Sequence, residues 1–430
     1  MQDPAALLPL ISAPDEALRG FDVARLLAPE QALVAYFGAA ALAPPVRETV
    51  ALEDAFGRVL AADAVAERDY PEHARSTMDG YAIASTDGRE RRRVTSEILM
   101  GATPSRPLQA GEAHRIPTGG ALPEGADAVV PQEDVAADGD WVLAREVLLP
   151  GTNVTQPADD VRAGETVLAA GRRIGAPELG VLATLGYARV DVFKRPRIAV
   201  VSTGDELVAP AQDPRPGQVR DSNRYAIAGA LAAMGALPVH FPRSADTLPA
   251  LRAAAGTALA QCDALVLTGG SSVGVRDLVP RVVAELGEPG VVVHGLRVKP
   301  GKPTLLGATG GQAVIGLPGN PTSSLMILEA VARPIVLALT GEGPSAPAPL
   351  AAVATLPFSG RAGWTWYVPA RLSMRAGALH AEPLLLRSAH TSLLARAGGY
   401  VILDENCARI AAGSTVYVHR FSAGGAPIGS

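Results

Sequence analysis

The second half of the chain alternates short valine- and leucine-rich runs with helical stretches, and this alternation restricts the fold more than any other feature. Apolar runs lie at residues 198–202, 237–241, 264–267, 291–298 and 313–317, and helical patterns lie at 226–234, 247–260, 277–286 and 321–339. Runs that are apolar at successive positions are typical of strands buried on both faces of a parallel sheet. The sequence therefore predicts a central three-layer α/β/α domain with a mostly parallel sheet over residues 195–340.

The regions on either side have a different pattern. Residues 24–194 begin with two predicted helices, at 29–43 and 52–60, joined by an extended segment at 48–52. Short β-like runs punctuated by glycine and proline follow, which favours irregular β domains. A glycine- and proline-rich linker at 341–347 leads to residues 348–421, which we expect to form a small C-terminal β domain. The predicted fold class is therefore multidomain, α/β plus β.

Four loops of the central domain have compositions that suit anion binding. They are Ser202-Thr203-Gly204-Asp205-Glu206, Thr268-Gly269-Gly270-Ser271-Ser272-Val273-Gly274, Lys299-Pro300-Gly301-Lys302-Pro303 and Gly316-Leu317-Pro318-Gly319-Asn320-Pro321. Glycine lets the backbone approach a ligand closely, and exposed N–H groups at the start of a helix attract negative charge. Ligands of open α/β sheets bind at the carboxyl ends of the strands. The loops therefore predict a phosphate or oxyanion site there.

Lysine usage supports this site. The chain has three lysines against thirty-five arginines, and two of the three, Lys299 and Lys302, share one proline-pinned loop. An ammonium group is a compact point charge that suits a single phosphate or oxyanion oxygen. A solvated turn with two incidental lysines is the alternative interpretation.

Carboxylates flank the same crevice. Glu206 is the last residue of the first loop, and Asp277 follows the second loop. Carboxylates beside a phosphate normally indicate a bridging Mg²⁺ ion. The alternative interpretation of Asp277 is a cap of the helix that it precedes, which does not exclude a metal role. Asp205 is as well explained by a turn as by a ligand.

Composition excludes several classes of function. The net charge is −5, so the whole chain offers no basic surface for nucleic acid or an anionic membrane, and the basic run at residues 89–93 is expected to be a solvated hairpin. Cys262 and Cys407 form no CxxC pair, and the seven histidines form no metal-binding pair. The start of the chain lacks the basic region of a secretory signal, and its most apolar stretch is short and interrupted by proline. We therefore expect a cytoplasmic location.

Seven motifs in order carry a resemblance to a known family. They are Ser76-Thr77-Met78-Asp79-Gly80-Tyr81-Ala82, Arg115-Ile116-Pro117-Thr118-Gly119-Gly120, Gly125-Ala126-Asp127-Ala128-Val129-Val130, Ser202-Thr203-Gly204-Asp205-Glu206-Leu207, Ser271-Ser272-Val273-Gly274, Lys299-Pro300-Gly301-Lys302-Pro303 and Gly316-Leu317-Pro318-Gly319-Asn320-Pro321. In this order they closely resemble the molybdopterin molybdenumtransferases, the MoeA family that also includes the E domain of gephyrin. The resemblance covers nearly the whole chain.

The resemblance implies an enzyme that inserts molybdate into adenylylated molybdopterin and releases AMP, assisted by a divalent cation, expected to be Mg²⁺. It also implies an elongated homodimer whose site is shared between the central domain of one subunit and the N-terminal β domain of the other. Other proteins of cofactor biosynthesis are further expected partners. The implied catalytic residues are Asp79, Thr118, Glu206, Lys299 and Lys302, and the implied metal ligands are Glu206, Asp277 and Asp160. The implied substrate-binding residues are Ser202, Thr203, Gly204, Asp246, Gly269, Gly270, Ser272, Gly274, Pro318, Gly319, Asn320 and Pro321.

The chain departs from the family pattern at two places. Val275 stands where the family usually carries an acid, and Thr155 and Ala158-Asp159 replace the usual residues before Asp160. These departures leave tungstate open as the preferred oxyanion. Two alternatives to the transferase remain: an enzyme like the molybdopterin adenylyltransferases, which resemble the central domain alone, and a non-catalytic scaffold of the gephyrin type.

Overall fold

The computed structural model of the chain describes residues 26–269, 278–343, 347–384 and 392–429, which divide into two units. The first unit contains residues 26–49, 57–61 and 191–429, and the second contains residues 50–56 and 62–190. The chain therefore passes between the units more than once.

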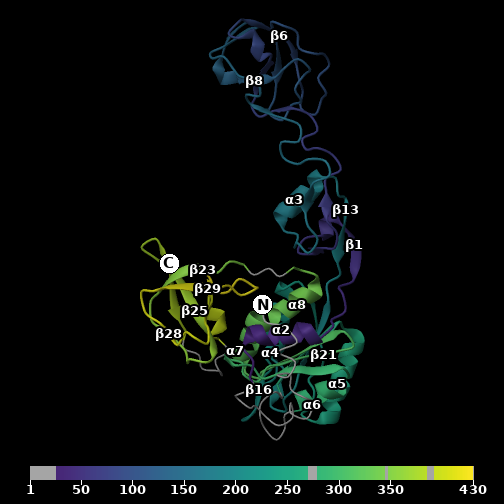
Figure 1. Cartoon of the computed structure of the whole chain (residues 1–430), viewed down its shortest axis with the longest axis vertical. Helices are drawn as coiled ribbons and strands as arrows, with labels where there is room; N and C mark the ends of the chain where they lie inside the picture. Colours follow the sequence, from purple (N-terminus) through teal and green to yellow (C-terminus); the bar gives the residue numbers. More distant parts are fainter. Residues whose placement is uncertain (1–25, 270–277, 344–346, 385–391, 430) are drawn as a thin grey trace. The chain divides into compact units, whose positions relative to one another are not determined.

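A six-stranded sheet in the order β17-β14-β18-β22-β21-β19 organises the first unit (Figure 1). The first four strands pair in parallel, whereas β21 runs antiparallel to both β22 and β19. The strands are β14 (Arg197–Ser202), β17 (Leu237–His240), β18 (Ala264–Thr268), β19 (Pro289–His294), β21 (Leu305–Thr309) and β22 (Gln312–Leu317). The predicted, mostly parallel sheet is confirmed.

Helices cover both faces of this sheet. One face packs against α2 (Pro29–Ala39), α4 (Asn223–Ala233) and the long helical segment formed by α7 (Pro321–Ile327), η7 (Leu328–Ala332) and α8 (Arg333–Thr340). The other face packs against α5 (Leu248–Gln261) and α6 (Val279–Glu285), which Figure 1 shows together on one side. Alternate residues of β14 supply the two cores, since Ile198 and Val200 belong to one and Ala199 and Val201 to the other. The three-layer prediction is therefore confirmed.

Two details of this domain differ from the sequence prediction. The run at 291–298 does not form one strand, because β19 ends at His294 and the chain then forms the short β20 (Val298–Lys299). The prediction also missed β21, which returns between β19 and β22 through a tight turn at Gly310 and Gly311. Buried antiparallel strands are as apolar as parallel ones, so their direction could not be predicted from the apolar pattern.

The C-terminal part of the first unit is a second sheet in the order β20-β25-β26-β23-β29-β27, closed by a further pairing of β25 with β27. Its other strands are β23 (Leu350–Ala354), β25 (Thr365–Arg375), β26 (Ala378–Pro383), β27 (Gly399–Leu403) and β29 (Thr415–His419). Smaller elements that lie wholly or mostly in this unit are β1 (Arg47–Ala51), β2 (Val59–Leu60), β13 (Arg189–Phe193), β15 (Leu207–Val208), β16 (Val219–Arg220), β24 (Phe358–Ser359), β28 (Arg409–Ile410) and η8 (Leu394–Arg396). The predicted small β domain is confirmed.

The second unit is built on a six-stranded sheet in the order β8-β5-β7-β6-β10-β9. Its strands are β5 (Gly80–Ile83), β6 (Arg92–Glu97), β7 (Glu112–Ile116), β8 (Ala128–Pro131), β9 (Val135–Asp138) and β10 (Trp141–Ala144). The remaining elements are β3 (Ala64–Val65), β4 (Arg75–Ser76), β11 (Val154–Thr155), β12 (Thr166–Leu168), η4 (Leu52–Asp54), η5 (Ser85–Asp87), η6 (Gln132–Asp134) and α3 (Ala176–Thr184). Irregular β structure was predicted for this region, whereas α3 was not.

The helix predicted at residues 52–60 is wrong. Only the single turn η4 forms, and Gly57 then takes a positive φ of 72° before Val59 and Leu60 pair with β13. A glycine in this conformation ends a helix, and the pairing of the strand outweighs the weak local helical preference.

The basic run at residues 89–93 is not a solvated hairpin throughout. Arg92 is only 1% exposed, and its guanidinium donates to the carbonyl oxygens of Gly88 at 2.7 Å and Glu90 at 3.0 Å. The neighbouring Arg91 lies over the ring of Trp141, 5.5 Å from its centre, and pairs with Asp138. These charges therefore serve local packing within the sheet.

Among the described residues, one helical stretch, Pro321–Thr340, is long and apolar enough to cross a bilayer. Most of its apolar window, 72%, is buried inside the first unit, as expected for a core helix.

Close packing at Gly80 yields a prediction for the second unit. A Cβ at this position would lie 1.9 Å from the carbonyl oxygen of Val130 on the paired strand β8. We expect Gly80→Ala to destabilise the second unit by about 1–3 kcal/mol or more, because the backbone must move. Gly180→Ala is the control, since a Cβ on this residue of α3 meets nothing within 4 Å. Thermal unfolding should show a lower transition for Gly80→Ala alone, and equal midpoints would contradict the packing.

Candidate functional site

Three of the four loops singled out in the sequence begin at the ends of neighbouring parallel strands. The third loop, residues 299–303, was predicted at the same edge but instead begins at the end of β20, which pairs with β25 of the C-terminal sheet. In the sheet register Ser202 lies opposite Thr268, and Thr268 lies opposite Leu317. The strands β14, β18 and β22 therefore end at one level, and the loops that leave them start side by side. The first and fourth loops are described whole, and the second is described up to Gly269.

These loops line a cavity of about 530 Å³. Its lining residues include most of the predicted binding residues of the central domain, namely Thr203, Gly204, Glu206, Asp246, Gly269, Pro318, Gly319, Asn320 and Pro321. Ser202 lies at the end of β14 behind the first loop, and it is 1% exposed. The cavity therefore gathers residues from six separate segments of the chain, as a small-molecule site does.

Asp246 connects the first loop to the segment between β17 and α5. Its carboxylate accepts a short hydrogen bond from the hydroxyl of Thr203 and a second bond, 3.3 Å long, from the N–H of Asp205. Arg243 donates to the carbonyl oxygen of Gly204 at 2.7 Å. Because the carboxylate is held by the loop, Asp246 orders the site as well as lining it.

Gly269 allows the first two loops to approach closely. Its φ is +96°, and a Cβ at this position would lie only 2.2 Å from the carbonyl oxygen of Thr203. Any other residue would separate the ends of β14 and β18. The glycine is therefore required by the backbone geometry of the cavity wall.

The two lysines belong to a loop that reaches this cavity, but neither lysine lines it. Pro303 of the same loop lines the cavity, whereas Lys299 is exposed at the end of β20, which pairs with β25 of the C-terminal sheet. The carbonyl oxygen of Lys302 accepts from the N–H of Leu296 at 2.8 Å, which folds the loop back. The catalytic roles of Lys299 and Lys302 stay predictions.

Several predicted residues lie outside the described part of the chain. They are Gly270, Ser272, Gly274 and Asp277, together with Val275, the residue that departs from the family pattern. Their roles also stay predictions.

In the second unit the structure brings together two predicted catalytic residues. The carboxylate of Asp79 accepts a hydrogen bond of 2.6 Å from the N–H of Thr118. This bond lowers the pKa of Asp79 below its ordinary value. Both side chains are exposed, so they are available to a ligand. Asp160, also exposed, lies beside Tyr70, to whose carbonyl oxygen its N–H donates at 3.2 Å.

The cavity is lined by carboxylate oxygens, the type of ligand that a hard divalent cation prefers. Glu206 and Asp246 line it, and so does Asp221. Within the described ranges, however, no three histidine, cysteine, aspartate or glutamate side chains come together closely enough to hold a metal ion. A cation here would therefore rely on few carboxylates and on oxygens of the substrate, as Mg²⁺ commonly does.

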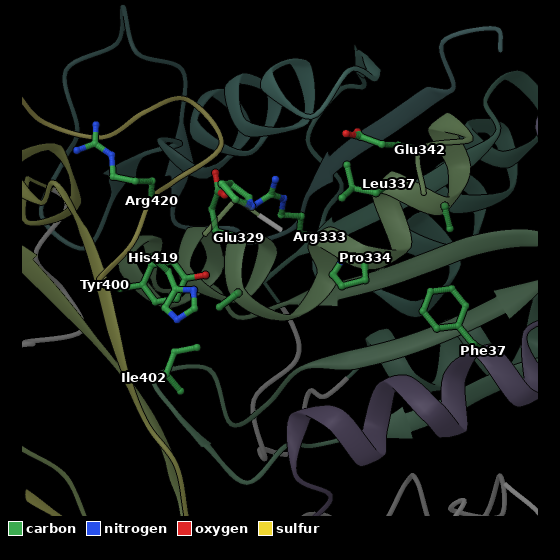
Figure 2. Close-up of a pocket in the computed structure, with 13 residues that line it drawn as sticks. Phe37, Glu329, Arg333, Pro334, Leu337, Glu342, Tyr400, Ile402, His419 and Arg420 are labelled. Carbon is green, nitrogen blue, oxygen red and sulfur yellow. The ribbon is translucent and has the colours of Figure 1, made fainter. Parts of the chain in front are cut away.

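A second cavity of about 490 Å³ lies elsewhere in the first unit, between α2, α8 and the strands β27 and β29 (Figure 2). The rings of Tyr400 and His419 stack on one side of it, and Glu329 lies beside Arg333. Burial raises the pKa of Glu329, whose carboxylate accepts bonds from the N–H and hydroxyl of Ser422. No residue predicted for the site lines this cavity, whereas nine of them line the first one.

Sequence reasoning missed one segment that lines the first cavity. Asp221, Ser222 and Asn223 lie directly before or at the start of α4, and all three line it. A run of aspartate, serine and asparagine before a helix is a capping signal. It could have directed attention to this helix start, but the pattern alone does not distinguish a cap from a ligand site.

The fold and the cavity together define a class of protein. A mostly parallel sheet whose glycine-rich loops line one cavity at the carboxyl ends of its strands belongs to α/β proteins that bind small phosphorylated or oxyanionic ligands.

Comparison with known proteins narrows this class. Residues 27–186 match the MoeA N-terminal region (domain I and II), residues 199–338 match a probable molybdopterin binding domain, and residues 351–421 match the MoeA C-terminal region (domain IV). The chain belongs to the molybdopterin molybdenumtransferase family, as the resemblance of its motifs predicted.

Individual relatives cover most of the chain. A molybdopterin molybdenumtransferase of a Nostoc strain is 35% identical over 68% of this chain and 70% of its own length. The molybdopterin molybdenumtransferase 2 of Mycobacterium tuberculosis is 33% identical over 86% of this chain and 94% of its own length. A solved molybdopterin biosynthesis MoeA protein from Pyrococcus horikoshii is 31% identical, has a TM-score of 0.74, and is matched over 92% of this chain and 99% of its own.

The Asp79 contact yields a prediction on pH. Because the N–H of Thr118 stabilises the ionised carboxylate, the contact is fully present above the ordinary pKa of an aspartate and is lost as the pH falls through the lowered one. The amide signal of Thr118 in NMR spectra should therefore shift only at a pH below the ordinary aspartate pKa. Asp79→Asn should abolish this shift, and a titration at or above the ordinary value would contradict the contact.

Proposed function

We propose that this chain is an enzyme of molybdenum cofactor biosynthesis that transfers molybdenum to molybdopterin. The observation that carries the proposal is the cavity at the ends of β14, β18 and β22, where glycine-rich loops from separate segments converge. The curated relatives that bear the name molybdopterin molybdenumtransferase support it. Family models match all three regions of the chain, which favours this activity over that of a single-domain adenylyltransferase.

The finer reaction that we propose consumes adenylylated molybdopterin and molybdate and yields molybdenum cofactor and AMP. The glycine-rich loops bind the phosphate groups through their N–H groups, and Asp246 holds the first loop in place through Thr203. Lys299 and Lys302 supply positive charge where negative charge develops as the phosphoanhydride bond breaks. Glycine N–H groups suit molybdate and tungstate alike, so the preferred oxyanion is a matter for direct measurement.

Glu206 and Asp246 would hold a divalent cation, for which Mg²⁺ is our expectation, and Asp277 is a further expected ligand. When bound, such a cation neutralises charge on the phosphate oxygens. The roles of Asp79, Thr118 and Asp160, the sharing of the site across a homodimer, and the cytoplasmic location are parts of the same proposal.

The lysine assignment is tested by substitution. Lys299→Ala and Lys302→Ala should each lower the rate of AMP release by about a hundredfold, as loss of one preorganised charge typically does. Lys194→Ala is the matched control, because it removes the only other lysine of the chain. AMP release by both loop variants at the wild-type rate, with saturating molybdate, would overturn the role of these lysines.

The shared site is tested by mixing inactive subunits. Asp79→Ala and Glu206→Ala proteins are combined under conditions that exchange subunits, so that half of the dimers contain one copy of each. If one site takes Asp79 from one subunit and Glu206 from the other, each mixed dimer has one intact site, and activity should return to about a quarter of wild type. A mixture that stays inactive would show that both residues come from one subunit.

A further inference from the structure

The side-chain amide of Asn223, at the start of α4, connects the ends of two cavity loops. Its Nδ2 atom donates to the hydroxyl of Thr268 at 2.9 Å and to the carbonyl oxygen of Gly319 at 2.7 Å. A carbonyl oxygen only accepts, so the contact with Gly319 fixes which amide atom is nitrogen. Both hydrogens of the amide are therefore used to tie α4, β18 and the fourth loop together.

These bonds determine how the fourth loop presents its backbone. The carbonyl oxygen of Gly319 faces Asn223, and that of Pro318 accepts from the hydroxyl of Thr268 at 3.5 Å. In a trans peptide the C=O and N–H groups point in opposite directions, so the N–H groups of Gly319 and Asn320 are turned away from these partners. Among the described residues neither N–H has a protein acceptor, and both residues line the cavity.

The oxygen of the side-chain amide, Oδ1, argues against a purely structural role for Asn223. Asn223 is 8% exposed, yet its Oδ1 has no hydrogen-bond partner in the described part of the chain. A buried acceptor without a partner costs stability. The residue type is therefore not explained by the stability of the fold, whereas its bonds to the hydroxyl of Thr268 and the carbonyl oxygen of Gly319 beside a ligand cavity explain it.

We propose that Asn223 is a positioning residue for oxyanion binding. It holds the loop Pro318-Gly319-Asn320 so that the N–H groups of Gly319 and Asn320 bind a tetrahedral oxyanion. Backbone N–H groups held in this way are worth more to an anion than mobile ones, because no reorganisation is needed on binding. Under the proposed function, on which this identification rests, the oxyanion is either a phosphoryl group of the nucleotide or molybdate.

The test compares two variants that lose equivalent bonds. Asn223→Leu removes the hydrogen bonds that the amide donates to the hydroxyl of Thr268 and to the carbonyl oxygen of Gly319 beside the cavity. Gln312→Leu is the matched control, because the Nε2 of Gln312 also donates twice, to the carbonyl oxygens of Leu259 and Cys262 at 2.9 and 2.6 Å, but at the start of β22, away from the cavity lining. Asn223→Asp is the second variant, which keeps the shape and lacks the N–H groups.

Binding of AMP and of molybdate is measured separately by calorimetry, with thermal unfolding of each variant beside it. We expect Asn223→Leu and Asn223→Asp to bind at least one of the two about tenfold or more weakly, and Gln312→Leu to bind both as wild type does. The ligand that weakens identifies the source of the oxyanion. Asn223→Asp alone decides the matter if Asn223→Leu does not fold.

Unchanged binding in Asn223→Asp would overturn the proposal, and so would an equal loss in Gln312→Leu, which would indicate a general loss of structure. These measurements need no turnover. If the wild-type protein binds AMP but releases none from adenylylated molybdopterin, the proposed function fails while the role of Asn223 stands.

Discussion

The parallel pairing of β14, β18 and β22 is the constraint on which the rest of the site depends. Their register places Ser202, Thr268 and Leu317 at one level, so that every loop leaving these strands starts at the same edge of the sheet. Apolar residues alternate between two cores above and below these strands, and this burial keeps the register from slipping. A shift by one residue would separate the loops and move every side chain of the shifted strand into the opposite core.

The site is built from polar groups that the fold holds at some cost. Ser202 is fully buried, and its hydroxyl has no hydrogen-bond partner within the described residues. The buried Oδ1 of Asn223 also lacks a hydrogen-bond partner there. Gly269 brings two loops closer than a side chain would allow. Features of this kind lower stability, and these three lie together at the edge of the sheet that borders the cavity. This distribution is expected where binding, rather than folding, selects the residue.

Much of the fold could be predicted because the strongest signals are local. The strands β14, β18 and β22 and the helix α5 appear in the sequence as long apolar or periodic runs. The errors occur where a distant partner outweighs local preference: Val59 and Leu60 join β13 instead of continuing a helix, and β21 turns back between two other strands. Arg92 is buried because carbonyl oxygens of a nearby turn surround it, which its basic neighbours did not suggest.

The sequence by itself determined the class of fold and the family, and it predicted the loops that line the cavity, because glycine, proline and lysine at particular spacings restrict backbone and charge directly. It also indicated Asp79, Thr118 and Glu206 as candidates. Only the tertiary structure decided which of these groups meet: Thr118 with Asp79, Thr203 with Asp246, and Asn223 with Gly319. These contacts join residues far apart in the chain, and their geometry follows from strand register and helix packing, which no local pattern encodes.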